Sequence, residues 1–291
     1  MVEPTVYING LFMRQSSAKV SIMDRGFCYG DGLFETIRVN KGKIYCLDKH
    51  IDRLFNSLPQ VLIDLPMTQL ELIKLTKEIL ARNEFKNAII RLEVTRGDTQ
   101  SNIEIDYETH PNLIINIRPY VPLPKTVYKR GVRVMLFYEQ ASLTNAVNKR
   151  LKSCNYLSNI LLKEISNKKN CMEGIVVDPN FGVTEGTTSN IFIVENGQLK
   201  TPPLSPYVLS GITRQIVIDI ARDNKIPIFE EQITKEELLD ADEIFITSSG
   251  IEIVPVTQVD SISIANKKPG ILTKFMHDEY LNYVEGEKIS C

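Results

Sequence analysis

The sequence predicts an α+β fold divided between two domains, and three observations support that prediction. The chain has 291 residues, and at roughly 150 residues per domain this length corresponds to about two domains. Strand-like and helix-like segments follow one another without the regular βαβ succession and glycine fingerprint of a doubly wound sheet. Prolines cluster in the segment PYVPLPK, which is typical of an extended spacer. We therefore expect a smaller N-terminal domain at 1–118, an interdomain linker at 119–127 and a larger C-terminal domain at 128–291.

The N-terminal domain is expected to begin with a hairpin, because the strand VYING ends in Asn-Gly, the strongest short hairpin signal. Strict alternation of apolar residues indicates strands, and apolar residues three and four positions apart indicate helices. In chain order the patterns predict strands over 6–10, 33–39 and 43–46, helices over 49–58 and 68–82, and strands over 89–95 and 113–117.

The same patterns continue in the C-terminal domain. They predict a strand over 131–138, a helix over 155–165, strands over 174–178 and 190–194, a helix over 213–222 and a last clear strand over 243–247.

Composition excludes several classes of protein. Lys and Arg total 34 against 36 Asp and Glu, so the net charge is -2, without the basic excess of a nucleic-acid binder. No apolar run reaches the length of a membrane helix, and the N-terminus lacks the features of a secretory signal. The 5 cysteines are scattered with no CxxC pair, and only 3 histidines are present, which disfavours disulfides and a metal site. We expect a cytoplasmic protein with no metal, no membrane contact and no nucleic-acid partner.

Lys152 is the first candidate for chemistry. It precedes an apolar helical stretch, and a lysine at such a junction can be partly buried, which lowers the pKa of its ammonium group and makes a nucleophilic amine. The alternative is a surface lysine in a basic loop, because Lys149 and Arg150 adjoin it.

Glu185 is the second candidate. It lies among small hydroxyl residues in VTEGTTSN, directly before the apolar strand IFIV. A buried carboxylate needs a cationic partner, and a protonated ring nitrogen would serve. The alternative is an ordinary turn rich in Thr and Ser with Glu185 exposed.

Two glycine- and serine-containing segments, LSGITR and TSSG, form the third candidate. Gly211 lies just before a predicted helix whose free amides can receive a phosphate, and hydroxyls that follow a buried strand can bind the same anion. No GxxxxGK[ST] loop is present, which favours a small phosphorylated cofactor over a nucleotide. An amine, a carboxylate and a phosphate site are the three requirements of pyridoxal 5'-phosphate.

Six ordered motifs carry a resemblance to a known family: FCYGDGLFETIRV, HIDRL, LKSCNYLSNIL, VTEGTTSNIFIV, LSGITR and FITSSGIEIVPV. The chain resembles the fold-type IV, or class IV, pyridoxal-phosphate-dependent aminotransferases, a group that includes branched-chain and D-amino-acid aminotransferases and aminodeoxychorismate lyase. The resemblance implies a two-domain fold with a small N-terminal α/β domain, a larger cofactor-binding domain containing a barrel-like sheet, and a homodimer.

The resemblance also implies a role for each residue at a motif position. Lys152 would form the Schiff base with pyridoxal 5'-phosphate and move the proton, Glu185 would pair with the pyridine nitrogen, and Tyr156 would hydrogen-bond the phenolic oxygen. The cofactor phosphate would be bound by Arg53, the backbone amides of Ile212 and Thr213, Ser249 and Ser248. The substrate pocket would be lined by Tyr29, Glu35 and Arg91.

The substrate-side residues combine features of several members. The Arg-x-His pair of D-amino-acid aminotransferases is missing from DTQSNIE after Gly97, and Ile89 replaces the tyrosine of the Tyr-x-Arg motif of branched-chain enzymes. One hypothesis is a transaminase moving an amino group between a branched-chain L- or D-amino acid and a 2-oxo acid, either 2-oxoglutarate or pyruvate. A second is 4-amino-4-deoxychorismate lyase, which releases pyruvate and 4-aminobenzoate. A third is a non-catalytic homologue that retains the fold.

Overall fold

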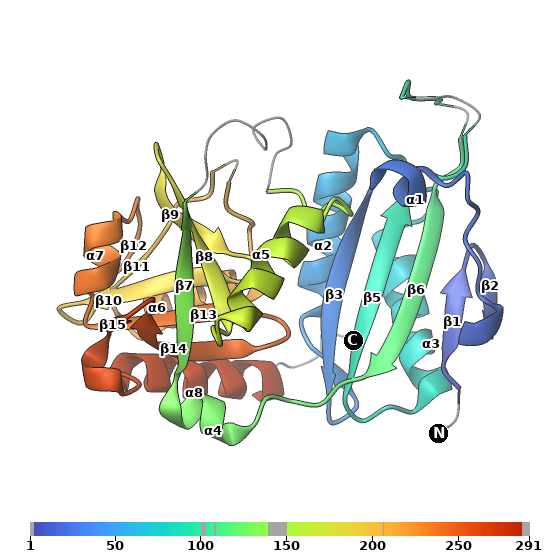
Figure 1. Cartoon of the computed structure of the whole chain (residues 1–291). Coiled ribbons are helices and arrows are strands. Elements are labelled where there is room, and N and C mark those ends of the chain that lie inside the picture. Colours follow the sequence, from blue (N-terminus) through green and yellow to red (C-terminus); the bar gives the residue numbers. More distant parts are fainter. Residues whose placement is uncertain (1–2, 100–102, 108, 139–149, 206, 287–291) are drawn as a thin grey trace. The chain divides into compact units, whose positions relative to one another are not determined.

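The computed structural model describes residues 3–99, 103–107, 109–138, 150–205 and 207–286 (Figure 1). The chain divides into two compact units. The first comprises Met1–Val121 with Leu151–Tyr156, and the second comprises Pro122–Arg150 with Leu157–Cys291. The domain and linker bounds expected from the sequence stay a prediction. Within the described residues, no helix combines the length and the apolarity needed to cross a lipid bilayer.

The first unit is built on a sheet whose neighbouring strands all run antiparallel. Across the described residues its strand order is β2-β1-β6-β5-β3-β4. Its strands are β1 (Thr5–Ile8), β2 (Leu11–Arg14), β3 (Gly32–Asn40), β4 (Lys43–Ile44), β5 (Ala88–Thr95) and β6 (Asn112–Pro119). Its helices are α1 (Arg25–Tyr29), α2 (Leu47–Ser57) and α3 (Gln69–Asn83), with short 3-10 turns at Gln15–Ser17 and Leu58–Val61. The expected strands and helices of this region are therefore confirmed, although β4 is shorter than predicted.

The predicted hairpin at the start of the chain is confirmed. β1 and β2 pair antiparallel around Asn9 and Gly10, and both turn residues have positive φ, at 45° and 94°. A type I′ turn requires this conformation at both central positions, and Asn-Gly tolerates it best.

Strand alternation decides which side chains of the first unit form the core. α2 and α3 pack against one face of the sheet (Figure 1). The strand side chains buried beneath them include Leu33, Ile37, Ile90, Leu92 and Val94. Fully burying an aliphatic side chain contributes about 1.5–3 kcal/mol, so this face holds the sheet and both helices together.

The segment Leu151–Tyr156 joins the first unit by lying along β3. The amide of Phe34 donates to the carbonyl of Lys152 at 2.9 Å, and the amide of Cys154 donates to the carbonyl of Gly32 at 2.9 Å. These two backbone bonds place Lys152 beside the beginning of β3, which lies more than a hundred positions earlier in the sequence.

The second unit contains a mixed sheet that curls into a half-barrel. Across the described residues its strand order is β12-β11-β10-β13-β14-β7-β8-β9, with β15 paired to β14. Its strands are β7 (Val132–Tyr138), β8 (Glu173–Asp178), β9 (Gly182–Gly186), β10 (Asn190–Glu195), β11 (Gln198–Thr201), β12 (Ile228–Glu230), β13 (Glu243–Ser248), β14 (Glu252–Val259) and β15 (Ile262–Ser263). Its helices are α4 (Lys125–Arg130), α5 (Leu157–Lys168), α6 (Ile212–Asp223), α7 (Lys235–Asp240) and α8 (Ile271–Gly286), with a 3-10 turn at Ala265–Lys267.

The prediction that 243–247 is the last strand is wrong, because β14 follows β13 and pairs antiparallel with it. Pro255 inside β14 lowers the strand signal, since proline cannot donate to a ladder. The structure accommodates it because Pro255 lies one residue before β14 begins to pair with β7, at Val256 and Val132. The proline-rich segment also differs in part from the expected spacer, since α4 begins at its last residue, Lys125.

Candidate active site

Lys152 lies half-buried beside two aromatic rings in the first unit. Its Nζ is 4.7 Å from the ring centre of Phe34 and 5.9 Å from that of Tyr156. The two rings pack edge to face, with centres 5.2 Å apart and planes at 84°. An ammonium group over an aromatic face is held electrostatically, and the rings restrict the positions that the amine can occupy. The structure thus brings together two predicted site residues, Lys152 and Tyr156.

Arg53 and Glu35 form a buried ion pair in the same unit. The carboxylate of Glu35 accepts from Nε of Arg53 at 2.7 Å and from Nη2 at 2.6 Å. His50, which lies three residues before Arg53 on α2, contacts the same carboxylate through Nδ1 at 2.7 Å. Glu35 is 1% exposed, because β3 directs it to the helix-covered face between Leu33 and Ile37. Glu35 therefore lies beneath Arg53, where it fixes the guanidinium group.

The ionisation of this cluster follows from its contacts. Although burial alone raises the pKa of the Glu35 carboxyl, the charge of Arg53 and the bonds from His50 outweigh it, and the net pKa is far below the usual range. Burial lowers the pKa of His50, and the charges of Arg53 and Lys152 lower it further, against the opposing effect of Glu35. Glu35 is consequently anionic and His50 neutral near pH 7, so Nδ1 of His50 carries the proton that it donates to Glu35.

Arg91 lies on β5, on the face of the sheet opposite to the core. Its guanidinium carbon is 3.9 Å from the ring centre of Phe34. Nε donates to the carboxylate of Glu93 at 3.0 Å, and the thiol of Cys154 donates to the same carboxylate at 3.2 Å. Burial and the Glu93 charge raise the pKa of the Cys154 thiol, which keeps the thiol protonated and unreactive.

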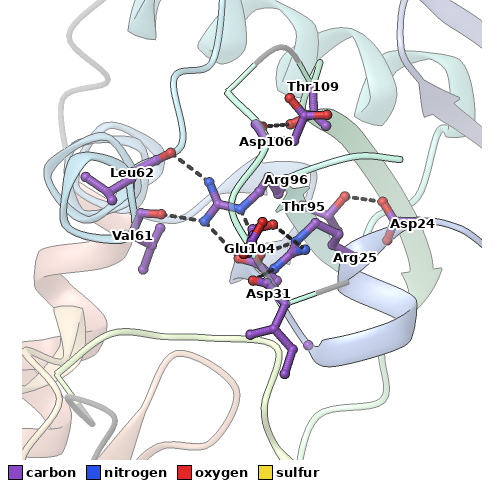
Figure 2. Close-up of polar contacts among 12 residues, drawn as sticks. Asp24, Arg25, Asp31, Val61, Leu62, Thr95, Arg96, Glu104, Asp106 and Thr109 are labelled. Carbon is purple, nitrogen blue, oxygen red and sulfur yellow. Dashed lines mark hydrogen bonds and ion pairs between the residues drawn. The ribbon is translucent and has the colours of Figure 1, made fainter. Parts of the chain in front are cut away.

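Tyr29, at the end of α1, is 47% exposed, and its ring lies 5.2 Å from the guanidinium carbon of Arg25. Figure 2 shows how this region is anchored: Arg25 and Arg96 both bond the carboxylate of Asp31, at 2.8 and 2.7 Å. Arg96 also donates to the carbonyls of Val61 and Leu62, and Arg25 to those of Ile103 and Glu104. The two arginines therefore hold the segment that carries Tyr29 against the end of β5.

Glu185 lies half-buried in β9 of the second unit, so the alternative of an exposed turn residue is wrong. Its Oε2 accepts from the amide of Leu209 at 2.8 Å and from the side-chain amide of Asn190 at 3.4 Å. Asn190 also donates to the carbonyl of Leu209 at 2.9 Å, which closes a small network. The carboxylate is thereby fixed to the segment that leads into α6.

The beginning of α6 has the properties of an anion site. Its N-cap is Gly211, so no side chain caps the amides of Ile212 and Thr213 in the first turn. A side chain at Gly211 would not fit, since its Cβ would lie 1.9 Å from Oδ1 of Asn190. Free amides and the positive end of the helix dipole favour a bound phosphate.

Ser248 and Ser249 follow the buried part of β13, and both are half-buried. Thr247, the residue before them, pairs with Asn190 in the β10–β13 ladder. Because Asn190 also bonds the Leu209 carbonyl, the end of β13, the network around Glu185 and the start of α6 belong to one end of the sheet.

The buried carboxylate of Glu173 stabilises the loop that follows β9. Glu173, 1% exposed, accepts hydrogen bonds from the hydroxyls of Thr187, Thr188 and Ser189. Nζ of Lys163 lies 3.6 Å from the same carboxylate. The three hydroxyl residues directly follow β9, so Glu173 fixes the loop between Glu185 and Asn190.

The residues present fit pyridoxal 5'-phosphate, since they supply an amine, a fixed carboxylate and an uncapped helix start. The sequence patterns missed His50, Glu93, Glu173 and Asn190. Two of them had a usable signal: His50 shares a helix face with Arg53, three residues away, and Glu93 shares a strand face with Arg91, two residues away. Across the described residues, no group of His, Cys, Asp and Glu side chains could hold a metal ion.

Comparison with known proteins gives one consistent result. The family model described as amino-transferase class IV matches residues 32–259. A Methanocaldococcus jannaschii protein named "Putative branched-chain-amino-acid aminotransferase" is 38% identical over 275 residues, 94% of each chain. The D-alanine aminotransferase of Bacillus licheniformis is 33% identical over 282 residues, 97% of this chain and 98% of its own. The crystal structure of the Escherichia coli branched-chain amino acid aminotransferase superposes with a TM-score of 0.93 at 27% identity, covering 99% of this chain and 98% of the other.

Proposed function

The chain belongs to the class IV aminotransferase family, and from that premise we propose that it moves an amino group between a branched-chain L- or D-amino acid and a 2-oxo acid. The expected α+β fold with a curled sheet is confirmed, and the enzymes of this family use pyridoxal 5'-phosphate. The bound cofactor supplies an electron sink for a substrate that loses its Cα proton.

In this proposal, Nζ of Lys152 binds the cofactor covalently and carries the proton to and from the substrate. Glu185 keeps a proton on the pyridine nitrogen, and Tyr156 donates to the phenolic oxygen. Arg53, the amides of Ile212 and Thr213, and the hydroxyls of Ser248 and Ser249 bind the phosphate. Tyr29 and Arg91 serve the substrate side, whereas Glu35 supports the phosphate site by holding Arg53 in place.

The observation that carries the proposal is the fixed carboxylate of Glu185. One of its oxygens accepts from the Leu209 amide at 2.8 Å, three residues before the uncapped start of α6. A carboxylate for the ring nitrogen and an anion site for the phosphate are thereby joined through one short segment. A small cofactor that carries both a ring nitrogen and a phosphate requires these two groups.

A half-reaction panel tests the proposal. Purified protein loaded with pyridoxal 5'-phosphate is mixed with single L- and D-amino acids, and the cofactor absorbance is recorded. An amino donor should convert the spectrum to that of pyridoxamine 5'-phosphate. Lys152→Ala should abolish multiple turnovers because it removes the covalent anchor and the base together, whereas Lys86→Ala, at an exposed lysine of the same unit, should not. Turnover by Lys152→Ala near the wild-type rate would sink the assignment.

Two finer points belong to the same proposal. Pyruvate release from 4-amino-4-deoxychorismate, with no spectral conversion by any amino acid, would replace the transaminase with the lyase. We also propose a homodimer, which sedimentation of the loaded enzyme tests directly. The cytoplasmic location expected from the composition and the N-terminal sequence stays a prediction.

A further inference from the structure

The outer face of the first-unit sheet carries a charged pair, Arg91 and Glu93, of which the proposed function uses only Arg91. The antiparallel register places Phe34 opposite Glu93, and Thr36 opposite Arg91. Arg91 and Glu93 are two residues apart on β5, so their side chains project from the same face. The Lys152 amine contacts the same face through the Phe34 ring, so the charges of this pair can act on a substrate held there.

Arg91 and Glu93 neutralise each other. Nε and Nη2 of Arg91 donate to the two carboxylate oxygens at 3.0 and 3.4 Å. The Cys154 thiol donates to the same carboxylate, which gives Glu93 a second partner and a defined position. The side chains are 36% and 23% exposed, so the pair is partly shielded from water while remaining accessible to a small molecule.

The pair lies within reach of the reacting amine. Phe34 contacts both cations: the Arg91 guanidinium carbon is 3.9 Å from its ring centre, and Nζ of Lys152 is 4.7 Å from the same point. The guanidinium carbon of Arg91 and Nζ of Lys152 can therefore lie no further apart than the sum of those two distances. A substrate bonded near Lys152 would extend its side chain over this range toward Arg91.

We propose that Glu93 is a specificity-determining residue that excludes substrates with an acidic side chain. A second substrate carboxylate could bind Arg91 only by displacing Glu93, which would leave two carboxylates close together with one cation between them. Like charges at such a distance repel strongly in a partly desolvated site. A neutral side chain meets no such cost, so the site takes amino acids and 2-oxo acids with one carboxylate. This inference rests on the proposed transaminase function.

The variant Glu93→Gln tests the inference, because glutamine has nearly the same size and removes only the charge. Two substrates of equal chain length are compared, glutamate and norvaline, in the enantiomer that the half-reaction panel selects. The wild type should favour norvaline in kcat/KM, and Glu93→Gln should shift the ratio toward glutamate by about tenfold or more. The double variant Arg91→Gln, Glu93→Gln should lose this gain, because the cation that would bind the second carboxylate is gone.

A binding measurement without turnover provides an independent readout. Calorimetric titration of the loaded enzyme with glutarate and with pentanoate compares two ligands that differ by one carboxylate. Glu93→Gln should lower the dissociation constant for glutarate and leave that for pentanoate unchanged. The matched control is Glu78→Gln, which breaks another Arg–Glu pair of the first unit, with Arg82 on α3, and should change neither ratio.

The outcomes separate the inference from the proposed function. Absence of amino-group transfer with every amino acid overturns the transaminase itself. If the wild-type enzyme transfers the amino group of glutamate as efficiently as that of norvaline, the role of Glu93 is overturned and the transaminase function stands. An unchanged glutamate-to-norvaline ratio in Glu93→Gln, with glutarate affinity also unchanged, does the same.

Discussion

Replacement of Glu35 by glutamine should destabilise the protein strongly, and the structure provides the magnitude. Glu35 is 1% exposed and accepts three hydrogen bonds, two from Arg53 and one from His50. Glutamine keeps the shape but removes the negative charge that faces the Arg53 guanidinium, whose side chain is 11% exposed. Removing one partner of a buried ion pair costs about 3–5 kcal/mol. For a chain of this size that loss lowers the midpoint of thermal unfolding by roughly 10 °C.

The cofactor should modify this loss if Arg53 binds its phosphate. In the apoprotein, Glu35→Gln removes the carboxylate that the Arg53 guanidinium contacts, whereas a bound phosphate supplies another anion. The decrease in unfolding midpoint should therefore be larger without pyridoxal 5'-phosphate than with it. Thermal unfolding of wild type and variant, each measured with and without cofactor, provides the four midpoints required.

Glu78→Gln is the matched control, since Glu78 pairs with Arg82 at 2.6 Å but both side chains are 46% exposed. An exposed helical pair of this kind contributes at most about 0.5 kcal/mol. If Glu35→Gln lowers the midpoint no more than Glu78→Gln does, the buried pair does not have the energetic role derived from its burial. Equal losses with and without cofactor would instead remove Arg53 from the phosphate site.

Three other predictions concern the supports of the site. Gly211→Ala should raise the dissociation constant for pyridoxal 5'-phosphate at least tenfold, because the added Cβ would collide with the side chain of Asn190. Absorbance titration measures this constant, and Gly286→Ala, where the space is open, is the control. An unchanged affinity of Gly211→Ala for the cofactor would refute the prediction. Folding stability should fall as pH decreases below about 6.5, because the pKa of buried His50 is lowered and the unfolded chain takes up the proton first. His50→Gln should flatten that decrease between about pH 7.5 and 5.5, and an identical slope would contradict it. Glu173→Gln should lower the free energy of unfolding in denaturant by about 1–3 kcal/mol, since an amide cannot accept all three hydroxyl donors. A decrease below about 0.5 kcal/mol would show that the loop after β9 does not depend on the Glu173 carboxylate.

Most elements of the first unit could be predicted because their signals are local. The Asn-Gly turn, the alternation of β3 and the apolar spacing of α2 and α3 depend only on neighbouring residues. Two strands missed in the second unit, β9 and β14, lack such signals. β9 reads GVTEG, with two glycines in five residues, and β14 contains Pro255. Their strand conformation comes from pairing with β8 and β13, which no local pattern contains.

The site divides in the same way. The sequence by itself determined the kinds of groups available, namely the amine of Lys152, the carboxylate of Glu185 and the glycine before α6, because the order of the motifs is a property of the chain alone. It placed Glu35 at the substrate pocket by resemblance. The tertiary structure decided that Glu35 lies beneath Arg53 on the helix-covered face of the sheet, since that contact joins residues on separate elements.

The same physical reason explains the charged pair that we propose as the specificity determinant. Alternation along β5 was enough to place Arg91 and Glu93 on one face. It could not show that Cys154 and Lys152 would lie against that face, because the two backbone bonds between β3 and 151–156 join residues more than a hundred positions apart. Local patterns in the sequence therefore predict the strands and helices of each domain. The selection of a substrate depends on contacts between distant residues, which only the folded chain creates.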